Sequence, residues 1–171
     1  MTQSIEIRKI IPPAFEHSHL GEKILCYRPM KHGMPNLSIE QMDSKVIAHN
    51  YGHGGSGWTL GPGSAKYVNT LLIESALGKA LSDKSIPIAI IGAGLVGLFT
   101  AYDLVQRGYR NITIYAEKLD ALASHYAGGL LAPVSMDNDH EMQAVIDQIG
   151  IDAYRFYDDV ARDKNSDFKQ G

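Results

Sequence analysis

The chain has 171 residues, the length of one domain, and its 44% hydrophobic and 20% charged residues are ordinary for a globular protein. Its formal net charge of −3 gives no electrostatic reason to expect a nucleic acid or an anionic membrane as a partner. The polar start "MTQSIEIRKI", the single cysteine and the lack of any apolar run near the roughly 18 residues of a membrane span together predict a soluble, cytoplasmic protein.

The first half of the chain alternates strand candidates with turns. The pattern predicts short strands at residues 23–27, 37–42 and 45–51, and the third strand runs into the glycine-rich stretch "HNYGHGGSGWTLGPG". The next stretch, "SAKYVNTLLIESALGKAL", has one largely apolar face at helical spacing. Ser64 is expected to cap the start of this helix.

The second half begins after "LSDKSIP" (81–87), a polar break and the best linker candidate. The run "IAII" predicts a buried strand, and "GAGLVG" predicts a turn into a helix that stops at Gly108. "NITIYAE" is the next predicted strand. Apolar residues at helical spacing predict a last helix from about Asp139 to Asp163.

The second glycine-rich stretch fits the pattern G-x-G-x-x-G in the context that a dinucleotide site requires. A strand precedes it, a helix and a strand follow, and Glu117 lies 20 residues after Gly97. Gly92 permits the tight turn, Gly94 lets a pyrophosphate approach the backbone, and Gly97 allows close helix–strand packing. Glu117 can accept hydrogen bonds from ribose hydroxyls and would repel a 2′-phosphate.

The first glycine-rich stretch has several competing interpretations. His49 and His53 have a four-residue spacing, but the glycine-rich surroundings argue against a metal site. Trp58 stands where a serine nucleophile elbow needs glycine, and no Gly-Lys-Ser/Thr follows as a phosphate loop would need. The simplest alternative is a flexible surface loop. The alternative that we favour is a strand–loop–helix unit whose helix N-terminus faces the pyrimidine side of a flavin.

Three stretches carry a resemblance to a known family. "HNYGHGGSGWTL" and "ITIYAEKLDALASHYAGGLLAP" resemble the D-amino-acid oxidase family of FAD enzymes, and "YRPM" is similar to the Arg-Pro step of that family. The resemblance extends over roughly residues 23–160. It implies FAD as cofactor, and it implies that Arg28 pairs with a substrate carboxylate while the backbone at Gly55 helps to orient the substrate.

The pattern and the resemblance together predict the site residues. The catalytic residues are Arg28 and Gly55, and no metal site is expected. The cofactor-binding residues fall in four segments: His53, Gly54, Gly55, Ser56, Gly57, Trp58 and Thr59; Gly92, Ala93, Gly94, Leu95, Val96 and Gly97; Glu117 and Lys118; and Ala127, Gly128, Gly129, Leu130 and Leu131.

The order of the two motifs departs from the family pattern. In the family the dinucleotide unit opens the chain and the histidine-glycine motif nearly closes it, whereas here the order is reversed, as in a circular permutation. We expect residues 1–84 to carry the permuted segment and residues 85–171 the first dinucleotide-binding unit, which together form one FAD-binding domain. The expected fold is α/β and Rossmann-like, with three layers and a mostly parallel sheet that includes strands 45–51, 88–91 and 111–117.

The antiparallel substrate domain of the family has no full counterpart here. Residues 23–27 and 37–42 are expected to lie at its edge. The apolar face of the last helix, from Met142 to Val160, is expected to need a partner, so the sequence predicts either a longer oxidase or a homo-oligomer. The chain by itself is expected to show little turnover.

The resemblance implies FAD-dependent oxidation of an amino acid or related amine, with hydride transfer from the α-carbon to flavin N5 and hydrolysis of the imine product. Two alternatives stay open. One is a cofactor-binding module, or an inactive piece, that binds FAD or ADP without turnover. The other is an NAD-dependent dehydrogenase, which would leave the histidine-glycine loop unexplained.

Overall fold

A computed structural model describes residues 12, 14, 16–75, 81–129, 131 and 139–168. The strands are β1 (Asn36–Met42), β2 (Lys45–Tyr51), β3 (Ile88–Ile91) and β4 (Ile112–Tyr115); the α-helices are α1 (Gly57–Glu74), α2 (Leu95–Gln106) and α3 (His140–Ala161); and the short 3-10 turns are His17–His19 and Gly54–Ser56. The mixed α/β class is therefore confirmed. No helix within the described residues is long and apolar enough to cross a membrane.

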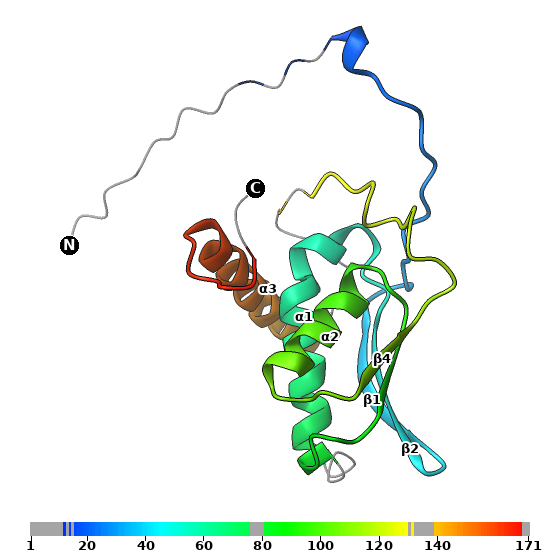
Figure 1. The fold of residues 1–171 in the computed structure, drawn as a ribbon, viewed down its shortest axis with the longest axis vertical. Coiled ribbons are helices and arrows are strands. Elements are labelled where there is room, and N and C mark those ends of the chain that lie inside the picture. The colour runs from blue at the N-terminus through cyan, green and yellow to red at the C-terminus, as the bar shows by residue number, and fades with distance from the viewer. Residues whose placement is uncertain are drawn as a thin grey trace, which may run out of the picture.

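The three helices form a layer beside the strands, with α1 in the middle (Figure 1). On one side α1 packs against α2, and on the other side against α3. Strand β2 precedes α1 in the sequence and strand β3 precedes α2. Each glycine-rich stretch therefore joins a strand to one of these two neighbouring helices.

The strands form two small sheets instead of the expected mostly parallel one. Strands β1 and β2 pair antiparallel from Asn36–Tyr51 to Met42–Lys45, and in the described part of the chain only β3 and β4 are parallel. The inclusion of residues 45–51 in the parallel sheet is therefore wrong. Only Asp43 and Ser44 separate β1 from β2, and Asp43 adopts a φ of 53° there. Such a two-residue connection favours a hairpin.

The predicted strand at residues 23–27 is also wrong. This segment is exposed and has no regular structure, and the nearest pairing is an isolated bridge between Met30 and His53. A strand needs a neighbour to satisfy its backbone groups, and none is present beside these residues in the described part of the chain.

The predicted linker, residues 81–87, is anchored to the core at its first residue, while residues 82–85 are exposed. Leu81 is buried in a cluster with Leu72, Ile90, Leu104 and Tyr109, and its carbonyl accepts a hydrogen bond from the Tyr109 hydroxyl at 2.8 Å. The cluster draws on both halves of the chain, which supports their packing as one unit. Residues 76–80, at the end of the predicted first helix, lie outside the described residues.

Helix α1 begins seven residues earlier than predicted, at Gly57, and runs through Pro62. Ser64 is therefore not a cap; its hydroxyl donates to the Gly61 carbonyl inside the helix. Proline has no N–H to donate to the carbonyl four residues before it, which here belongs to Trp58. The Tyr157 hydroxyl of α3 supplies the missing donor at 2.5 Å.

The apolar face of α3 is covered by α1. Ile146, Ile149 and Ala153 are buried, and the backbone of the two helices meets where a Cβ on Gly63 would lie 1.9 Å from the Ile149 carbonyl oxygen. The expectation that this face needs a partner outside the chain is therefore wrong. The sequence pattern alone could not show that α1 covers the face.

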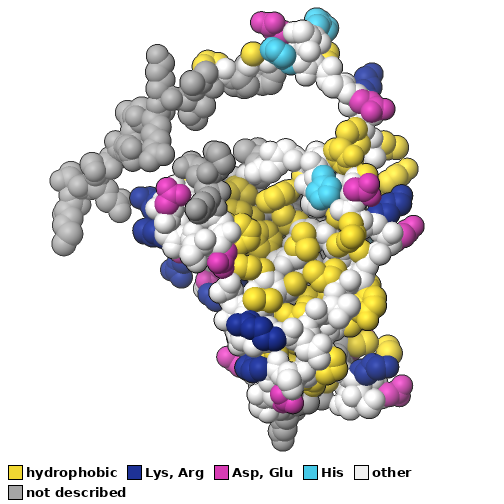
Figure 2. All heavy atoms as spheres, in the orientation of Figure 1, with side chains coloured by type: hydrophobic (Ala, Val, Ile, Leu, Met, Phe, Trp, Pro, Cys, Tyr) yellow, Lys and Arg dark blue, Asp and Glu magenta, His cyan; other side chains and the backbone are white. Residues whose placement is uncertain are grey.

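Apolar surface remains on the outer face of the parallel pair. Ile88, Ile90, Ile112 and Ile114 face the helices, whereas Ile91 and Tyr115 are 82% and 56% exposed. Figure 2 shows that hydrophobic side chains gather over the middle of the visible face, with charged side chains toward its rim.

Candidate functional site

Helices α1 and α2 lie parallel, which brings both glycine-rich stretches to the same end of the helix layer. Gly61 near the start of α1 lies against Leu95 and Phe99 of α2, and Thr70 further along α1 accepts a hydrogen bond from Arg107 after α2. Both sequence numbers increase in the same direction, so the two helix N-termini point to one region. The two glycine loops are far apart in the sequence, but they thus face a common space.

The second glycine loop has the geometry that its pattern predicts. Gly92 has a φ of 108°, which favours glycine. A Cβ on Gly97 would lie 2.1 Å from the Gly92 carbonyl oxygen, so the helix can approach the strand only without a side chain there. A Cβ on Gly94 would meet no protein atom within 4 Å, so the space beside this residue is open to a ligand.

Glu117 and Lys118 follow β4 at the carboxyl end of the parallel pair. The Gly92 amide donates to the Tyr115 carbonyl at 2.7 Å, which sets the end of β4 beside the glycine turn. Both residues are exposed. The Glu117 carboxylate is therefore available near the start of α2, where the ribose of a bound dinucleotide would lie.

The N-termini of α1 and α2 differ from that of α3. The residues before α1 and α2, Ser56 and Gly94, make no side-chain cap, and neither helix has an acidic residue in its first turn. Asp139 caps α3 by accepting from the Met142 amide at 2.8 Å, and Glu141 lies in the first turn. Uncapped N–H groups and the positive end of the helix dipole suit an anionic or strongly polar ligand.

Arg28 and Gly55, the two predicted catalytic residues, lie together. A Cβ on Gly55 would lie 2.8 Å from Nη1 of Arg28. The backbone holds this arrangement, because the Gly54 amide donates to the Pro29 carbonyl at 3.0 Å and the Lys31 amide donates to the Gly52 carbonyl at 3.3 Å. Arg28 is exposed, so its guanidinium is available to a carboxylate at the mouth of the loop.

Trp58 joins the first glycine loop to the loop that contains the predicted small residues. Its indole Nε1 donates to the Ser124 carbonyl at 3.1 Å, and its own carbonyl accepts from Tyr157. Ala127, Gly128 and Gly129 are exposed a few residues after Ser124, Leu131 is 44% exposed, and Leu130 lies outside the described residues.

Tyr157 is a contributor to the site that the sequence did not reveal. Burial raises the pKa of its hydroxyl far above the ordinary value, so the hydroxyl stays protonated and serves as a donor. A proline four residues after Trp58, inside a helix, is the sequence signal that could have indicated a free carbonyl needing such a donor.

We expect Tyr157→Phe to lower the free energy of unfolding by about 1–3 kcal/mol, because the Trp58 carbonyl would lose its donor in a partly buried position. Chemical denaturation measures this change. Tyr154→Phe is the matched control, since Tyr154 is 69% exposed on the same helix and its change should stay within about 0.5 kcal/mol. Equal effects of the two substitutions would show that the hydrogen bond does not support the loop.

His53 is buried in the first glycine loop without side-chain partners. It is 3% exposed, and neither ring nitrogen has a hydrogen-bond partner within the described residues. Its backbone carbonyl accepts from both the amide and the hydroxyl of Ser56. The loop is therefore held by the backbone of His53 and not by its ring, whose two nitrogens are buried without a hydrogen-bond partner within the described residues.

Burial lowers the pKa of His53 from 6.5 to about 4, because the charged ring would lose its hydration. The unfolded chain takes up a proton near pH 6.5 and the folded chain only near 4, so this contribution to stability is complete above 6.5 and is lost as the pH falls toward 4. We expect the loss to be about 3 kcal/mol relative to His53→Gln, measured by denaturation across this range. Parallel pH profiles for the two proteins would contradict a neutral buried ring.

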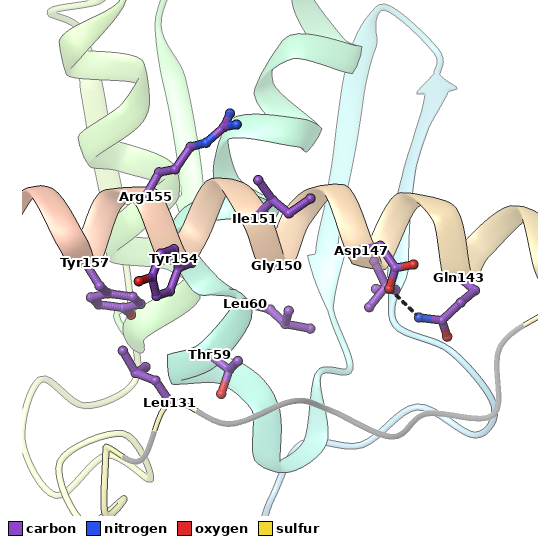
Figure 3. Close-up of a pocket in the computed structure, with 11 residues that line it drawn as sticks. Thr59, Leu60, Leu131, Gln143, Asp147, Gly150, Ile151, Tyr154, Arg155 and Tyr157 are labelled. Carbon is purple, nitrogen blue, oxygen red and sulfur yellow. Dashed lines mark hydrogen bonds between the residues drawn. The ribbon is translucent and has the colours of Figure 1, made fainter. Parts of the chain in front are cut away.

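A pocket of about 760 Å³ adjoins the first glycine loop on the side of α3 (Figure 3). Thr59 and Leu60 line it at the start of α1, and Ile151, Tyr154 and Tyr157 line it from α3. The pocket is therefore lined in part by Thr59, which the sequence predicts to bind the cofactor.

The residues present fit a dinucleotide cofactor. The open space at Gly94 and the uncapped start of α2 suit a pyrophosphate, and Glu117 suits a ribose. The start of α1, which has no side-chain cap, lies at the same end. The predicted segments thus lie at one end of the helix layer, except Leu130, which is outside the described residues.

Comparison with known proteins gives the same assignment for the second half of the chain. The model of the family DAO, FAD dependent oxidoreductase, matches residues 87–171. No solved structure matches the chain significantly. The matched residues contain β3, the second glycine loop, α2, β4 and α3, whereas the first glycine loop lies before them. Over residues 87–171 the chain belongs to the FAD dependent oxidoreductase family, whose cofactor is FAD.

Proposed function

We propose that both glycine loops bind a single FAD and that the protein oxidises an amino acid or a related amine. The observation that carries this proposal is the parallel packing of α1 and α2, which directs two uncapped helix N-termini to one region. FAD carries a central pyrophosphate and a polar flavin ring at one end, so a single FAD could occupy two such sites.

In this proposal the second glycine loop holds the pyrophosphate, and Glu117 accepts from the adenosine ribose. The first glycine loop, from His53 to Thr59, donates backbone N–H groups to the pyrimidine edge of the flavin. When bound, FAD supplies a two-electron acceptor for the hydride of the substrate α-carbon. The protein contributes orientation: Arg28 binds the substrate carboxylate through charged hydrogen bonds, beside the exposed backbone of Gly55.

The positions of α1 and β3 support the proposed circular permutation. Helix α1 runs parallel to α2, and in a strand–turn–helix unit the strand runs opposite to the helix that follows it. The end of α1 and the start of β3 therefore lie at the same end of the molecule. A short connection through residues 75–87 can join the family's last helix to its first strand without moving either loop.

The experiment is anaerobic reduction of the FAD-loaded protein by a panel of D- and L-amino acids and simple amines, followed by flavin absorbance. The proposal predicts that at least one amine with a carboxylate next to its α-carbon bleaches the flavin. A flavin that is bound but bleached by none of these compounds, while dithionite still reduces it, would overturn the assignment of this substrate class.

Arg28→Ala, tested in whatever longer form of the protein is active, is expected to raise KM for the carboxylate-bearing substrate while FAD stays bound. The lost charged pair should remove about 2–5 kcal/mol of transition-state stabilisation, measured as kcat/KM. Lys31→Ala, in the same exposed segment, is the control for a general loss of positive charge. A kcat/KM that falls equally in both variants, or in neither, would remove Arg28 from the site.

A cofactor-binding module without turnover is the second candidate function. The exposure of the whole segment from residue 21 to residue 31 favours it, because an active site that excludes water needs cover over Arg28. The same reduction experiment separates the two candidates, since a module of this kind binds FAD tightly and accepts electrons only from chemical reductants.

A further inference from the structure

A short chain of polar contacts links the strand that leads into the first glycine loop to the helix that follows the second. Asn50 lies two residues before Gly52 at the entry to the first loop, and its Nδ2 donates to Oγ1 of Thr100 on α2 at 3.2 Å. The Thr100 hydroxyl donates in turn to the Val96 carbonyl at 2.8 Å. Val96 lies in the first turn of α2, within the second glycine-rich stretch. Two hydrogen bonds through one hydroxyl therefore connect the end of β2, just before the first glycine loop, to the first turn of α2, just after the second.

Few neighbouring groups could replace the hydrogen bonds of this bridge. Asn69 of α1, which is 1% exposed, donates to the Thr100 carbonyl at 3.1 Å and to the Asp103 carboxylate at 2.8 Å. The Asn50 Oδ1 is buried and has no hydrogen-bond partner within the described residues, so the Asn50 side chain is oriented by Thr100 alone. Loss of the Thr100 hydroxyl would leave the Asn50 amide without a partner.

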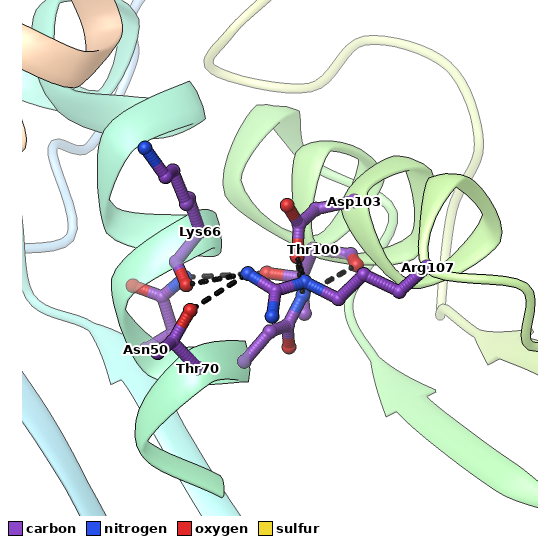
Figure 4. Close-up of polar contacts among 7 residues, drawn as sticks. Asn50, Lys66, Thr70, Thr100, Asp103 and Arg107 are labelled. Carbon is purple, nitrogen blue, oxygen red and sulfur yellow. Dashed lines mark hydrogen bonds and ion pairs between the residues drawn. The ribbon is translucent and has the colours of Figure 1, made fainter. Parts of the chain in front are cut away.

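A neighbouring polar cluster, which meets the surroundings of the bridge at Asp103, holds the far halves of α1 and α2 together. The Arg107 guanidinium donates to Asp103 at 2.6 Å, to the Thr70 hydroxyl at 2.7 Å and to the Lys66 carbonyl at 3.1 Å. Figure 4 shows Arg107 reaching from α2 across to Lys66 and Thr70 on α1. This cluster keeps the helices together without touching either loop, so it provides an internal control.

We infer that Asn50 and Thr100 are positioning residues that fix the spacing of the two loops for one ligand that spans both. The inference rests on the proposed function, because a ligand that touches one loop alone would be indifferent to this spacing. FAD would contact both loops, whereas ADP has the pyrophosphate and adenosine but no flavin, and it would contact only the second loop. The bridge should therefore matter for FAD and not for ADP.

The experiment measures the dissociation constants of FAD and of ADP by titration calorimetry for the full chain and three variants. Thr100→Val keeps the shape of the side chain and removes the hydroxyl, and Asn50→Ala removes the other end of the bridge. Thr70→Val makes the same chemical change at the far cluster. We expect Thr100→Val and Asn50→Ala each to weaken FAD about five- to tenfold and ADP less than about twofold.

The control and the double variant make the result specific. Thr70→Val is expected to leave both dissociation constants within about twofold, because its hydrogen bond lies away from the loops. The double variant Asn50→Ala/Thr100→Val should weaken FAD no more than either single change, since both remove one bridge. Thermal unfolding of each variant shows whether it folds, and the ratio of the two constants is then independent of a uniform loss of stability.

Failure of the proposed function and failure of this inference alone are distinguishable. If the unchanged chain binds FAD no more tightly than ADP, the first loop does not contact the cofactor, and both the proposed function and this inference are overturned. If FAD binds more tightly than ADP but the ratio is the same in Thr100→Val and Thr70→Val, only the positioning role is overturned. If Thr100→Val weakens FAD and ADP equally, the bridge supports the second loop alone and the inference fails.

Discussion

Gly94→Val is expected to abolish FAD binding while leaving the fold intact, with affinity reduced by at least about a hundredfold. The backbone of Gly94 has φ −71° and ψ 174°, an extended conformation open to any residue, and an added Cβ would meet no protein atom within 4 Å. The valine side chain therefore meets no steric obstacle within the protein itself. The cost arises only when a pyrophosphate must occupy the same space, and titration with FAD measures it.

Gly21→Val controls for the substitution itself. Gly21 is exposed and its Cβ would also meet nothing within 4 Å, but it lies outside the predicted site. Both variants should unfold at the denaturant concentration of the unchanged chain, and only Gly94→Val should lose FAD. Retention of FAD by Gly94→Val would mean that the open space at the start of α2 is not the pyrophosphate site.

Gly63→Ala is expected to have the largest effect on stability, a loss of at least about 3 kcal/mol. The added Cβ would lie 1.9 Å from the Ile149 carbonyl oxygen and 3.1 Å from the Ala153 amide nitrogen, where the backbones of α1 and α3 meet. Both groups are backbone inside a helix, so neither can move aside as a flexible side chain would. The helices would have to separate, which exposes Leu60, Val68 and Ile146 to water.

Gly150→Ala is the matched control within the same helix pair. Gly150 lies in the middle of α3, and its Cβ would meet nothing within 4 Å. Because alanine is the better helix former, this change should stabilise the protein by about 0.5–1 kcal/mol. Chemical denaturation of both variants gives the comparison, and a mild effect of Gly63→Ala would contradict the close crossing of α1 and α3.

The second glycine loop could be predicted from the sequence because its chemistry is local. A strand, a turn that needs glycine, an uncapped helix and an acidic residue after the next strand all follow each other along the chain. Gly92 has a positive φ and Gly97 lies against the Gly92 carbonyl, as a tight strand–turn–helix connection requires, and Glu117 follows the end of β4. The ends of α3 were also predictable, since Asp139 acts as a local cap.

The features that the sequence did not predict depend on contacts between distant segments. The pairing of residues 45–51 with β1 instead of β3 was decided by the short connection at Asp43. The early start of α1 was concealed by Pro62, because only the distant Tyr157 hydroxyl makes the proline tolerable at that position. The apolar face of α3 packs against α1, and β3, α2 and β4 lie between these two helices in the sequence.

Calorimetric titration of the full chain with FAD, ADP, FMN and NAD tests the central claim, that two glycine loops converge on one FAD. The convergence predicts that FAD binds with a stoichiometry of one and more tightly than ADP or FMN, because only FAD contacts both loops, and more tightly than NAD. Equal affinities for FAD and ADP would show that the first loop takes no part in binding and would contradict the claim.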